Sequence, residues 1–387
     1  MREQWFKLVG MAGAAIVLAA VTPARGEIVV GVVTSQTGPV SSIGIPYGRG
    51  IAAGHAYISE AGGENIRFIL LDDGSDPSNA TKNARKLIEE EKVDVLIGTA
   101  GTPATAAMVG IATELSVPMI AFSPVPSIPK PAGIPWAISV PQPPSLMVGV
   151  VVEQMHKAGV KSVGFVGFSD AWGDLVYNNL KATGEPLGMT IVTNERYARA
   201  DTSVTAQVLK VIAAKPDGFM CGGSGTGGAL PYLALAERGY KGPIFGTPAL
   251  INPDFVRLAG KSAEGLIAST GPITVVEQLP DDHPNKKIGL AFKDAHLKAT
   301  GVPSTDGFSA YSFDAWLLLV DAAKRALGKA KPGTPEFHAA MREAIYSISE
   351  VVGTHGVYTY RPESHLGTDR RALVLVRLEQ GQWKPLK

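Results

Sequence analysis

The hydrophobic positions of the chain form short apolar runs that alternate with longer helical stretches. Four runs near the start are rich in β-branched residues and predict strands, at 28–33, 66–71, 93–98 and 117–122. The stretches after the first three predict helices, at 46–60, 77–91 and 102–115. Asp76 supports the second helix, because it stands at the N-cap position before Pro77. This alternation predicts an α/β fold, with a parallel sheet between two layers of helices.

A proline-rich stretch at 124–144 interrupts the alternation. It holds eight prolines, too many for one regular element, and therefore marks a boundary. Beyond it, strands are predicted at 162–166, 189–193, 218–221 and 243–246, and helices at 145–158, 172–183, 202–214 and 229–238. A second polar crossing at 270–284 precedes helices at 285–300, 307–328 and 335–348 and tail strands at 356–360 and 372–378. The simplest interpretation is a second α/β unit after the first.

The first 26 residues have the pattern of an export signal. Arg2 and Lys7 precede 14 residues without a charge, and the small residues Ala24 and Gly26 suit cleavage before Glu27. An uncleaved anchor is the alternative, but the apolar run is shorter than the roughly 20 residues that a membrane span needs. We therefore predict a signal peptide at 1–26 and a periplasmic mature protein.

Composition excludes several classes of protein. The 387 residues suggest two or three domains, and 45% apolar residues provide material for real cores. Removal of 1–26 takes away three basic residues and one acidic residue, and leaves 33 basic and 34 acidic residues. This balance argues against a duplex-binding protein, so no nucleic-acid partner is expected. The single cysteine, Cys221, excludes an intrachain disulfide, and the seven histidines show no metal-ligand spacing. No metal or other cofactor is expected.

Motifs for nucleotide binding and catalysis are incomplete. Residues 223–228 match G-x-G-x-x-G, but the next predicted strand runs into Thr247 and Pro248 and supplies no acidic residue for a ribose. A glycine turn that lines a ligand is the better interpretation. Cys221 ends an apolar strand and is interpreted as a buried small hydrophobe rather than a nucleophile. No convincing acid, base or nucleophile pair is present, so a non-enzymatic protein is expected.

The turns after the predicted strands offer polar groups that suit ligand binding. Thr102 is predicted to cap a helix that has Pro103 at its first position, and the free N–H groups of a helix start favour an anion such as a carboxylate. An ordinary cap without a ligand is the alternative. Trp172 and Ser224 follow strands of the second unit, where Trp172 either covers an apolar ligand or packs against its own helix. Two open sheets facing each other would bring these turns to one interdomain cleft.

These residues, taken in order, resemble a known family. The opening run 28–33 is followed by Thr37, Gly38, Pro39 and Gly44, then Asp72, Asp73 and Asp76, then Gly98, Gly101 and Thr102, the Ser123-Pro124 turn, Asp170, Trp172, Gly173, Gly222 and Gly223. The chain resembles the periplasmic solute-binding proteins of ABC importers, type I, of the leucine/isoleucine/valine-binding group, over nearly the whole mature chain.

The resemblance implies two Rossmann-like lobes joined by three hinge crossings near 140–143, 270–275 and 353–357. Lobe 1 would comprise 27–141 plus 273–355, and lobe 2 would comprise 142–272 plus 356–387. It also implies ligand contacts between the lobes, at Ser42, Ile43, Gly101, Thr102, Val125, Ser127, Trp172, Ser224 and Pro248. The implied function is capture of a small carboxylate-bearing ligand by a monomer that docks on the membrane permease subunits of an importer. A sensor that signals to a membrane partner and an enzyme on the same scaffold are the alternatives.

Two departures from the family pattern bear on the ligand. Amino-acid-binding members place a carboxylate where this chain has 247–249, and often an aromatic residue at the position of Ser224. A buried ammonium without a countercharge is costly. Asp170 is one alternative source of that countercharge. The hypothesis is therefore a small carboxylate with an apolar or aromatic body.

Overall fold

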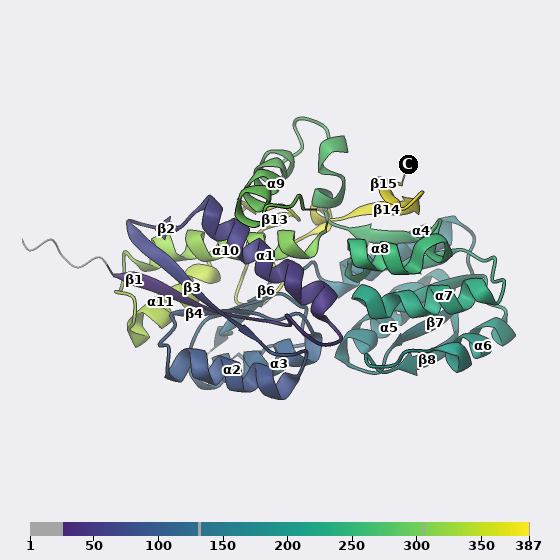
Figure 1. Ribbon diagram of the computed structural model, residues 1–387, viewed down its shortest axis with the longest axis horizontal. Helices are drawn as coiled ribbons and strands as arrows, with labels where there is room; N and C mark the ends of the chain where they lie inside the picture. The colour runs from purple at the N-terminus through teal and green to yellow at the C-terminus, as the bar shows by residue number, and fades with distance from the viewer. Residues whose placement is uncertain (1–25, 131–132, 305, 387) are drawn as a thin grey trace, which may run out of the picture.

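The computed structural model describes residues 26–130, 133–304 and 306–386. The predicted signal peptide lies outside the described residues, apart from Gly26. Within the described ranges, no helix combines the length and the apolar character that crossing a bilayer requires. Figure 1 shows two α/β lobes side by side along the long axis of the molecule, joined near its middle.

Lobe 1 is built on a six-stranded sheet with the order β2-β3-β1-β4-β5-β6, in which only β2 is antiparallel to its neighbour. Its strands are β1 (Glu27–Thr34), β2 (Glu60–Ala61), β3 (Glu64–Asp72), β4 (Val95–Gly98), β5 (Met119–Ala121) and β6 (Ala137–Ser139). Its helices are α1 (Ser41–Tyr57), α2 (Pro77–Glu89), α3 (Thr102–Glu114), α9 (Lys286–Thr300), α10 (Phe308–Ala326) and α11 (Pro335–Ile345). Helices α2 and α3 cover one face of the sheet, and α1, α10 and α11 pack in the core on the other (Figure 1).

Lobe 2 is built on a seven-stranded sheet with the order β15-β14-β11-β10-β9-β7-β8, in which β14 and β15 are antiparallel to their neighbours. Its strands are β7 (Ser162–Phe168), β8 (Thr190–Tyr197), β9 (Gly218–Gly222), β10 (Ile244–Gly246), β11 (Ile267–Thr270), β14 (Val374–Glu379) and β15 (Gln382–Pro385). Its helices are α4 (Pro144–Lys157), α5 (Ala171–Gly184), α6 (Thr205–Ala214), α7 (Leu230–Glu237) and α8 (Pro253–Ala259). The predicted pair of α/β units is confirmed.

Two predicted elements have different bounds in the structure, and one strand was not predicted. Helix α1 begins at Ser41, five residues before its predicted start, and contains Pro46 in its second turn. Strand β6 lies inside the proline-rich stretch, where three consecutive residues without proline, 137–139, pair with β5 at the sheet edge. Strand β8 continues to Tyr197, four residues beyond its predicted end, and this extension affects the site.

The tail of the chain divides between the lobes. Strand β13 (Val357–Tyr358) pairs with β12 (Val351–Val352), and Tyr358 and Tyr360 are buried in the core of lobe 1. Their hydroxyls donate to Asp314 and to the carbonyl of Ser139, which holds this segment on lobe 1. The third crossing therefore lies near 367–373, ahead of β14, rather than at 353–357, and residues 356–366 pack with lobe 1 rather than with lobe 2.

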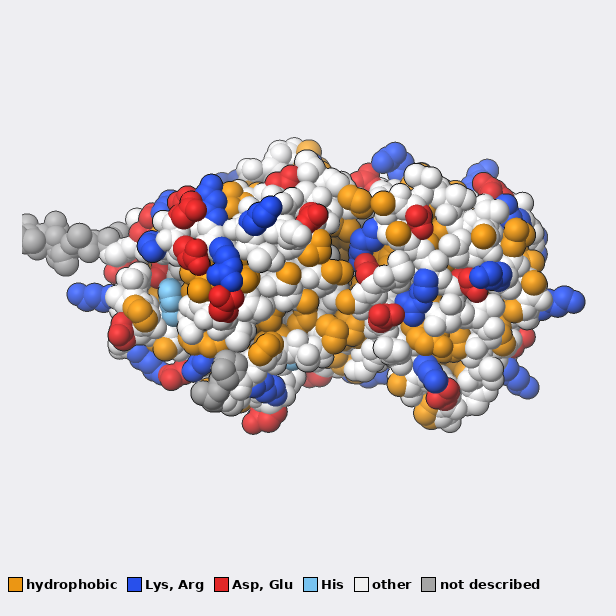
Figure 2. Space-filling view, turned by 90° about the horizontal axis from the view of Figure 1, so that it is seen from below, with side chains coloured by type: hydrophobic (Ala, Val, Ile, Leu, Met, Phe, Trp, Pro, Cys, Tyr) orange, Lys and Arg blue, Asp and Glu red, His pale blue; other side chains and the backbone are white. Residues whose placement is uncertain are grey.

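The face of the molecule seen from below has no large patch of a single charge sign. Figure 2 shows hydrophobic side chains gathered near the boundary between the lobes, while basic and acidic side chains are interspersed over the rest of this face. Apolar surface therefore concentrates where the two lobes meet.

Candidate ligand-binding cleft

A cavity with about 430 Å³ of empty space lies between the carboxyl ends of the two sheets. Such strand ends, where the strand order reverses, are where open α/β sheets bind ligands. Lobe 1 contributes Ile43, Tyr47, Ala100, Thr102, Phe122, Ser123, Pro124, Pro141, Phe308 and Tyr311. Lobe 2 contributes Met147, Trp172, Arg199, Ser224, Pro248 and Ala249. Most of the lining is apolar, with a few polar groups, as in small-molecule sites.

Five predicted ligand contacts line this cavity together: Ile43, Thr102, Trp172, Ser224 and Pro248. The other four do not. Ser42 faces lobe 2 beside the cavity, Gly101 lines a neighbouring cleft, Val125 is buried in the core of lobe 1, and Ser127 is exposed.

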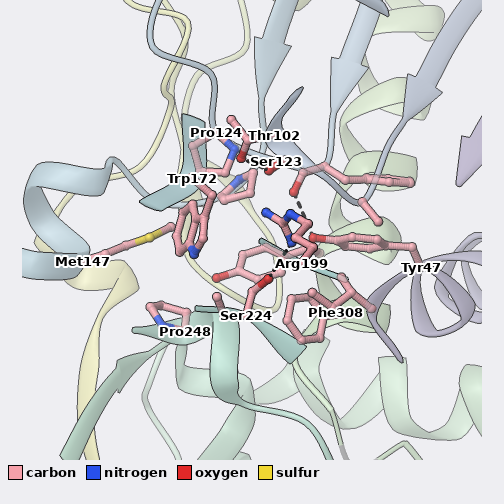
Figure 3. Close-up of a pocket in the computed structure, with 16 residues that line it drawn as sticks. Tyr47, Thr102, Ser123, Pro124, Met147, Trp172, Arg199, Ser224, Pro248 and Phe308 are labelled. Carbon is pink, nitrogen blue, oxygen red and sulfur yellow. Dashed lines mark hydrogen bonds between the residues drawn. The ribbon is translucent and has the colours of Figure 1, made fainter. Parts of the chain in front are cut away.

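Thr102 has a different local role from the predicted one. It is the first residue of α3, and the N-cap is Gly101, whose position carries no side-chain cap bond. The prediction that Thr102 caps the helix is therefore wrong, because its hydroxyl oxygen lies 2.8 Å from the hydroxyl oxygen of Ser123 instead. Figure 3 shows these two hydroxyls close together at the cavity. They meet at the start of α3, where the helix dipole favours negative charge.

Arg199 is the charged residue that sequence reasoning missed. Among the lining residues within the described part of the chain it alone carries a charge, and it lies in the loop after β8. Its Nε donates to Asp170 Oδ2 at 2.6 Å, its Nη1 donates to the Ser224 hydroxyl at 3.1 Å, and its guanidinium carbon lies 4.3 Å from the centre of the Phe168 ring. The length of β8 is the signal that could have identified Arg199. A strand that ends at Tyr197, rather than at residue 193 as predicted, places Arg199 at the carboxyl edge of the sheet.

Both carboxylate oxygens of Asp170 accept hydrogen bonds from neighbouring groups of the protein. Its Oδ1 accepts the N–H groups of Trp172 and Gly173 at 2.9 and 3.2 Å as the cap of α5, and its Oδ2 accepts from Arg199. Asp170 does not line the cavity and is already paired with Arg199, so its role as a countercharge for a ligand ammonium stays an untested suggestion. No acidic side chain is found in the cavity lining formed by the described residues.

The cavity wall is aromatic. The ring of Tyr47 stacks on Phe122, with ring centres 4.4 Å apart and planes 16° apart, and it meets Phe308 edge-on at 5.6 Å. The Tyr47 hydroxyl donates to the carbonyl of Phe122, and burial raises the Tyr47 pKa well above its usual value. Trp172 is 5% exposed and its Nε1 donates to the carbonyl of Gly223. Trp172 thus both packs in lobe 2 and reaches the cavity, and the wall suits a flat apolar body.

One wall residue is hydrogen-bonded to the first crossing, which is hydrogen-bonded in turn to the third. The Tyr311 hydroxyl donates to the side-chain oxygen of Gln142 in the first crossing, and Gln142 Nε2 donates to the carbonyl of Ala372 in the third at 2.9 Å. His355 stacks on Tyr311, with ring centres 3.5 Å and planes 4° apart. Burial lowers the pKa of His355 to about 3, so its ring is neutral at physiological pH.

The glycine turn and the cysteine do not form a second chemical site. Gly223 supplies the carbonyl that accepts from Trp172, so its turn supports the ligand cavity. Cys221 is fully buried, and burial raises its pKa to about 12, which keeps the thiol protonated. Its interpretation as a buried hydrophobe is confirmed. Among the described residues no group of three or more His, Cys, Asp or Glu side chains could hold a metal ion.

Two α/β lobes with a cavity between their strand ends define a two-lobed solute-binding protein. The family model described as periplasmic binding protein matches residues 27–382, and the chain belongs to this family. An extracellular ligand-binding receptor from Rhodopseudomonas palustris HaA2 has 42% sequence identity to this chain, covers 93% of it and 100% of its own length, and superposes with a TM-score of 0.89.

Two more distant relatives have names that refer to ligand binding or to transport. Leu/Ile/Val-binding protein homolog 3 of Brucella melitensis biotype 1 is 22% identical over 371 residues, which are 94% of this chain and 95% of that protein. A solute-binding protein of an ABC transporter from R. palustris, solved in complex with benzoate, is 24% identical, covers 93% and 96% of the two chains, and has a TM-score of 0.75. The resemblance to the leucine/isoleucine/valine-binding group and the two-lobed fold are confirmed.

Proposed function

We propose that this protein is the periplasmic ligand-capturing component of an ABC importer and that it binds a small carboxylate with an apolar or aromatic body. The observation that carries the proposal is the composition of the cavity. Arg199, Thr102 and Ser123 supply a cation and two hydroxyls, while aromatic rings form much of the remaining wall and no acidic side chain lines it. The chain is exported after removal of 1–26, acts as a monomer, and passes its ligand to membrane permease subunits without chemical change.

The charge of the cavity lining favours a carboxylate without an amino group over an α-amino acid as the ligand. An α-amino acid would bring a buried ammonium into a cavity in which Arg199 is the only charged group among the described lining residues, and none of these residues offsets the cost. A carboxylate instead gains a charge-assisted hydrogen bond, and an arginine can bind both of its oxygens. The benzoate complex of the distant relative supports this proposal, because a ring with one carboxylate has the same two features.

Ligand capture depends on which lobe supplies each of the polar and aromatic groups of the cavity. Thr102 and Ser123 stand on lobe 1, whereas Arg199 and Trp172 stand on lobe 2, so the full set of partners exists only when the lobes meet. Ligand contacts that are made only in the closed arrangement shift the protein toward it, by hinge motion at the three crossings. The closed form is the one that docks on the permease.

A binding panel tests the ligand class. Isothermal titration of the mature protein with benzoate, phenylacetate, 4-methylpentanoate and leucine should show binding of the acids that lack an amino group. Each acid has a carboxylate on an apolar body, whereas leucine adds the ammonium for which the cavity has no countercharge. Tight leucine binding with the other three acids inert would refute the proposal.

The Thr102→Val variant tests the carboxylate end. The substitution keeps the shape of the side chain and removes a hydroxyl that is in position to donate to a charged group, so binding of the preferred acid should weaken by roughly 1.5–3 kcal/mol. The measurement is the Kd from titration, with the melting temperature as a check on folding. An unchanged Kd would remove Thr102 from the site.

A further inference from the structure

Ser42, at the start of α1, joins lobe 1 to lobe 2 beside the cavity without lining it. Its hydroxyl oxygen lies 3.2 Å from the backbone nitrogen of Thr226 and 3.4 Å from the Thr226 hydroxyl, and its carbonyl accepts from Asn252 Nδ2 at 3.3 Å. The next residue, Ile43, lines the cavity. One residue therefore carries three polar contacts between the lobes, next to the ligand space.

The hydroxyl contact satisfies a backbone group that lobe 2 leaves open. Thr226 is the second residue of the 3-10 helix η3 (Gly225–Ala229), and the first N–H groups of a helix have no partner within it. The N-cap residue Ser224 makes no side-chain cap bond, and its hydroxyl accepts from Arg199 instead. The Ser42 hydroxyl of lobe 1 thus takes the place of a cap for a helix of lobe 2.

The contact between the Ser42 carbonyl and the Asn252 side chain depends on Pro46 of α1. In an α-helix the carbonyl of Ser42 would accept the N–H of residue 46, but Pro46 has none. Asn252 Nδ2 occupies that vacant acceptor, while Asn252 Oδ1 caps α8 through the Phe255 N–H at 2.7 Å. A free acceptor of lobe 1 and a fixed donor of lobe 2 therefore meet.

Gly225 allows the lobes to approach this closely. Its φ of +53° is in the left-handed region, and a Cβ at this position would lie 2.6 Å from the Ser42 hydroxyl oxygen and 3.1 Å from Ile43 Cγ1. A larger residue would be strained in conformation and would also push Ser42 away.

We propose that Ser42, Gly225, Thr226 and Asn252 form a closure latch, a set of positioning residues that stabilises the closed arrangement whatever ligand is bound. The proposal rests on the proposed function, in which capture requires closure. These contacts exist only when the lobes are together, and none of the four residues lines the cavity, so the latch contributes the same factor to the affinity for every ligand.

Three variants and one control test the latch by titration with two acids of different shape, benzoate and 4-methylpentanoate. Ser42→Ala removes the acceptor of Thr226, Asn252→Ser removes the donor and keeps the cap of α8, and Gly225→Ala separates the surfaces. Ser42→Ala and Asn252→Ser should each raise Kd by roughly three- to tenfold, as expected for lost neutral hydrogen bonds, by the same factor for both acids and through faster dissociation. Ser41→Ala, at the neighbouring position without a side-chain bond between the lobes, should leave Kd unchanged.

A distance measurement tests the latch without any ligand. Spin labels at Lys82→Cys on α2 and Lys181→Cys on α5 report the separation of the lobes, and the buried Cys221 stays unlabelled. Ser42→Ala and Gly225→Ala should shift the ligand-free distance distribution toward longer separations. An unchanged distribution, or affinity losses that differ several-fold between the two acids, would overturn the proposal. If neither acid binds the wild type, the ligand class is wrong, and the distances still decide on the latch.

Discussion

Replacing Arg199 by alanine is expected to remove most of the binding of an acidic ligand. The substitution deletes the only cation among the described residues of the cavity lining and leaves Asp170 without its ion-pair partner, at 2.6 Å in the wild type. Both the lost charge-assisted bond and the unpaired carboxylate oppose an anion. Breaking a buried charged contact costs roughly 3–5 kcal/mol, which corresponds to more than about a hundredfold in Kd.

Two comparisons make this experiment specific. Arg199→Lys keeps the charge and loses the planar fork, so its Kd should fall between those of the wild type and Arg199→Ala. Arg196→Ala removes a neighbouring arginine that lies over the rings of Phe165 and Tyr177 outside the cavity, and it should leave Kd unchanged. A Kd for Arg199→Ala within threefold of the wild type would show that the guanidinium does not bind the ligand.

The second large effect concerns stability and pH. Asp314 is fully buried on α10, where its carboxylate accepts from the N–H groups of Thr354 and His355 and from the Tyr358 hydroxyl. Burial raises the pKa of Asp314 to about 6, because these hydrogen bonds offset only part of the cost of removing the charge from water. The folded protein therefore keeps this proton at a pH where the unfolded chain has lost it.

The sign of the effect follows from proton binding. Between pH 4 and pH 6 the folded state holds more protons at Asp314 than the unfolded state does, so the free energy of unfolding falls as the pH rises through this window. A shift from 3.8 to about 6 corresponds to about 3 kcal/mol, present in full below pH 4 and lost above pH 6.

Urea unfolding of the ligand-free protein at intervals from pH 4 to pH 7 measures this contribution. The matched variant is Asp314→Asn, which has the same size and cannot titrate. The free energy of unfolding of the wild type, relative to that of the variant, should decrease by about 3 kcal/mol across the range. A difference that stays flat, or that rises with pH, would contradict the assignment to Asp314.

The fold was predictable from sequence because its signals are local. Apolar runs of β-branched residues marked the parallel strands, and Asp76 with Pro77 marked the start of α2. The tail was harder to assign. The pairing of β13 with β12 and the burial of Tyr358 and Tyr360 depend on partners at Asp314 and Ser139, far away in the sequence, so no local pattern indicated which lobe this segment joins.

Sequence patterns placed Thr102 and Trp172 in turns at the ends of strands, and both line the cavity, although the predicted capping role of Thr102 is wrong. No local sequence pattern pointed to Arg199, because its position in the cavity depends on the length of β8 and on tertiary contacts with Asp170 and Ser224. Ser42 was placed near the correct point, yet its contact with Thr226 and Asn252 depends on how the lobes meet. Sequence patterns predict where the strands of a sheet end. They predict less reliably which side chains at those ends contact other parts of the protein.

The stacking of Tyr311 on His355 has a consequence for how the ligand range of this protein can be changed. The same ring forms the cavity wall and is tied through Gln142 to the first and third crossings, while His355 of lobe 1 stacks on its face. A substitution there alters selectivity and domain motion at once. Redesign toward new substrates is therefore best begun at Pro248 and Ala249, which shape the opposite wall and leave the pivot intact.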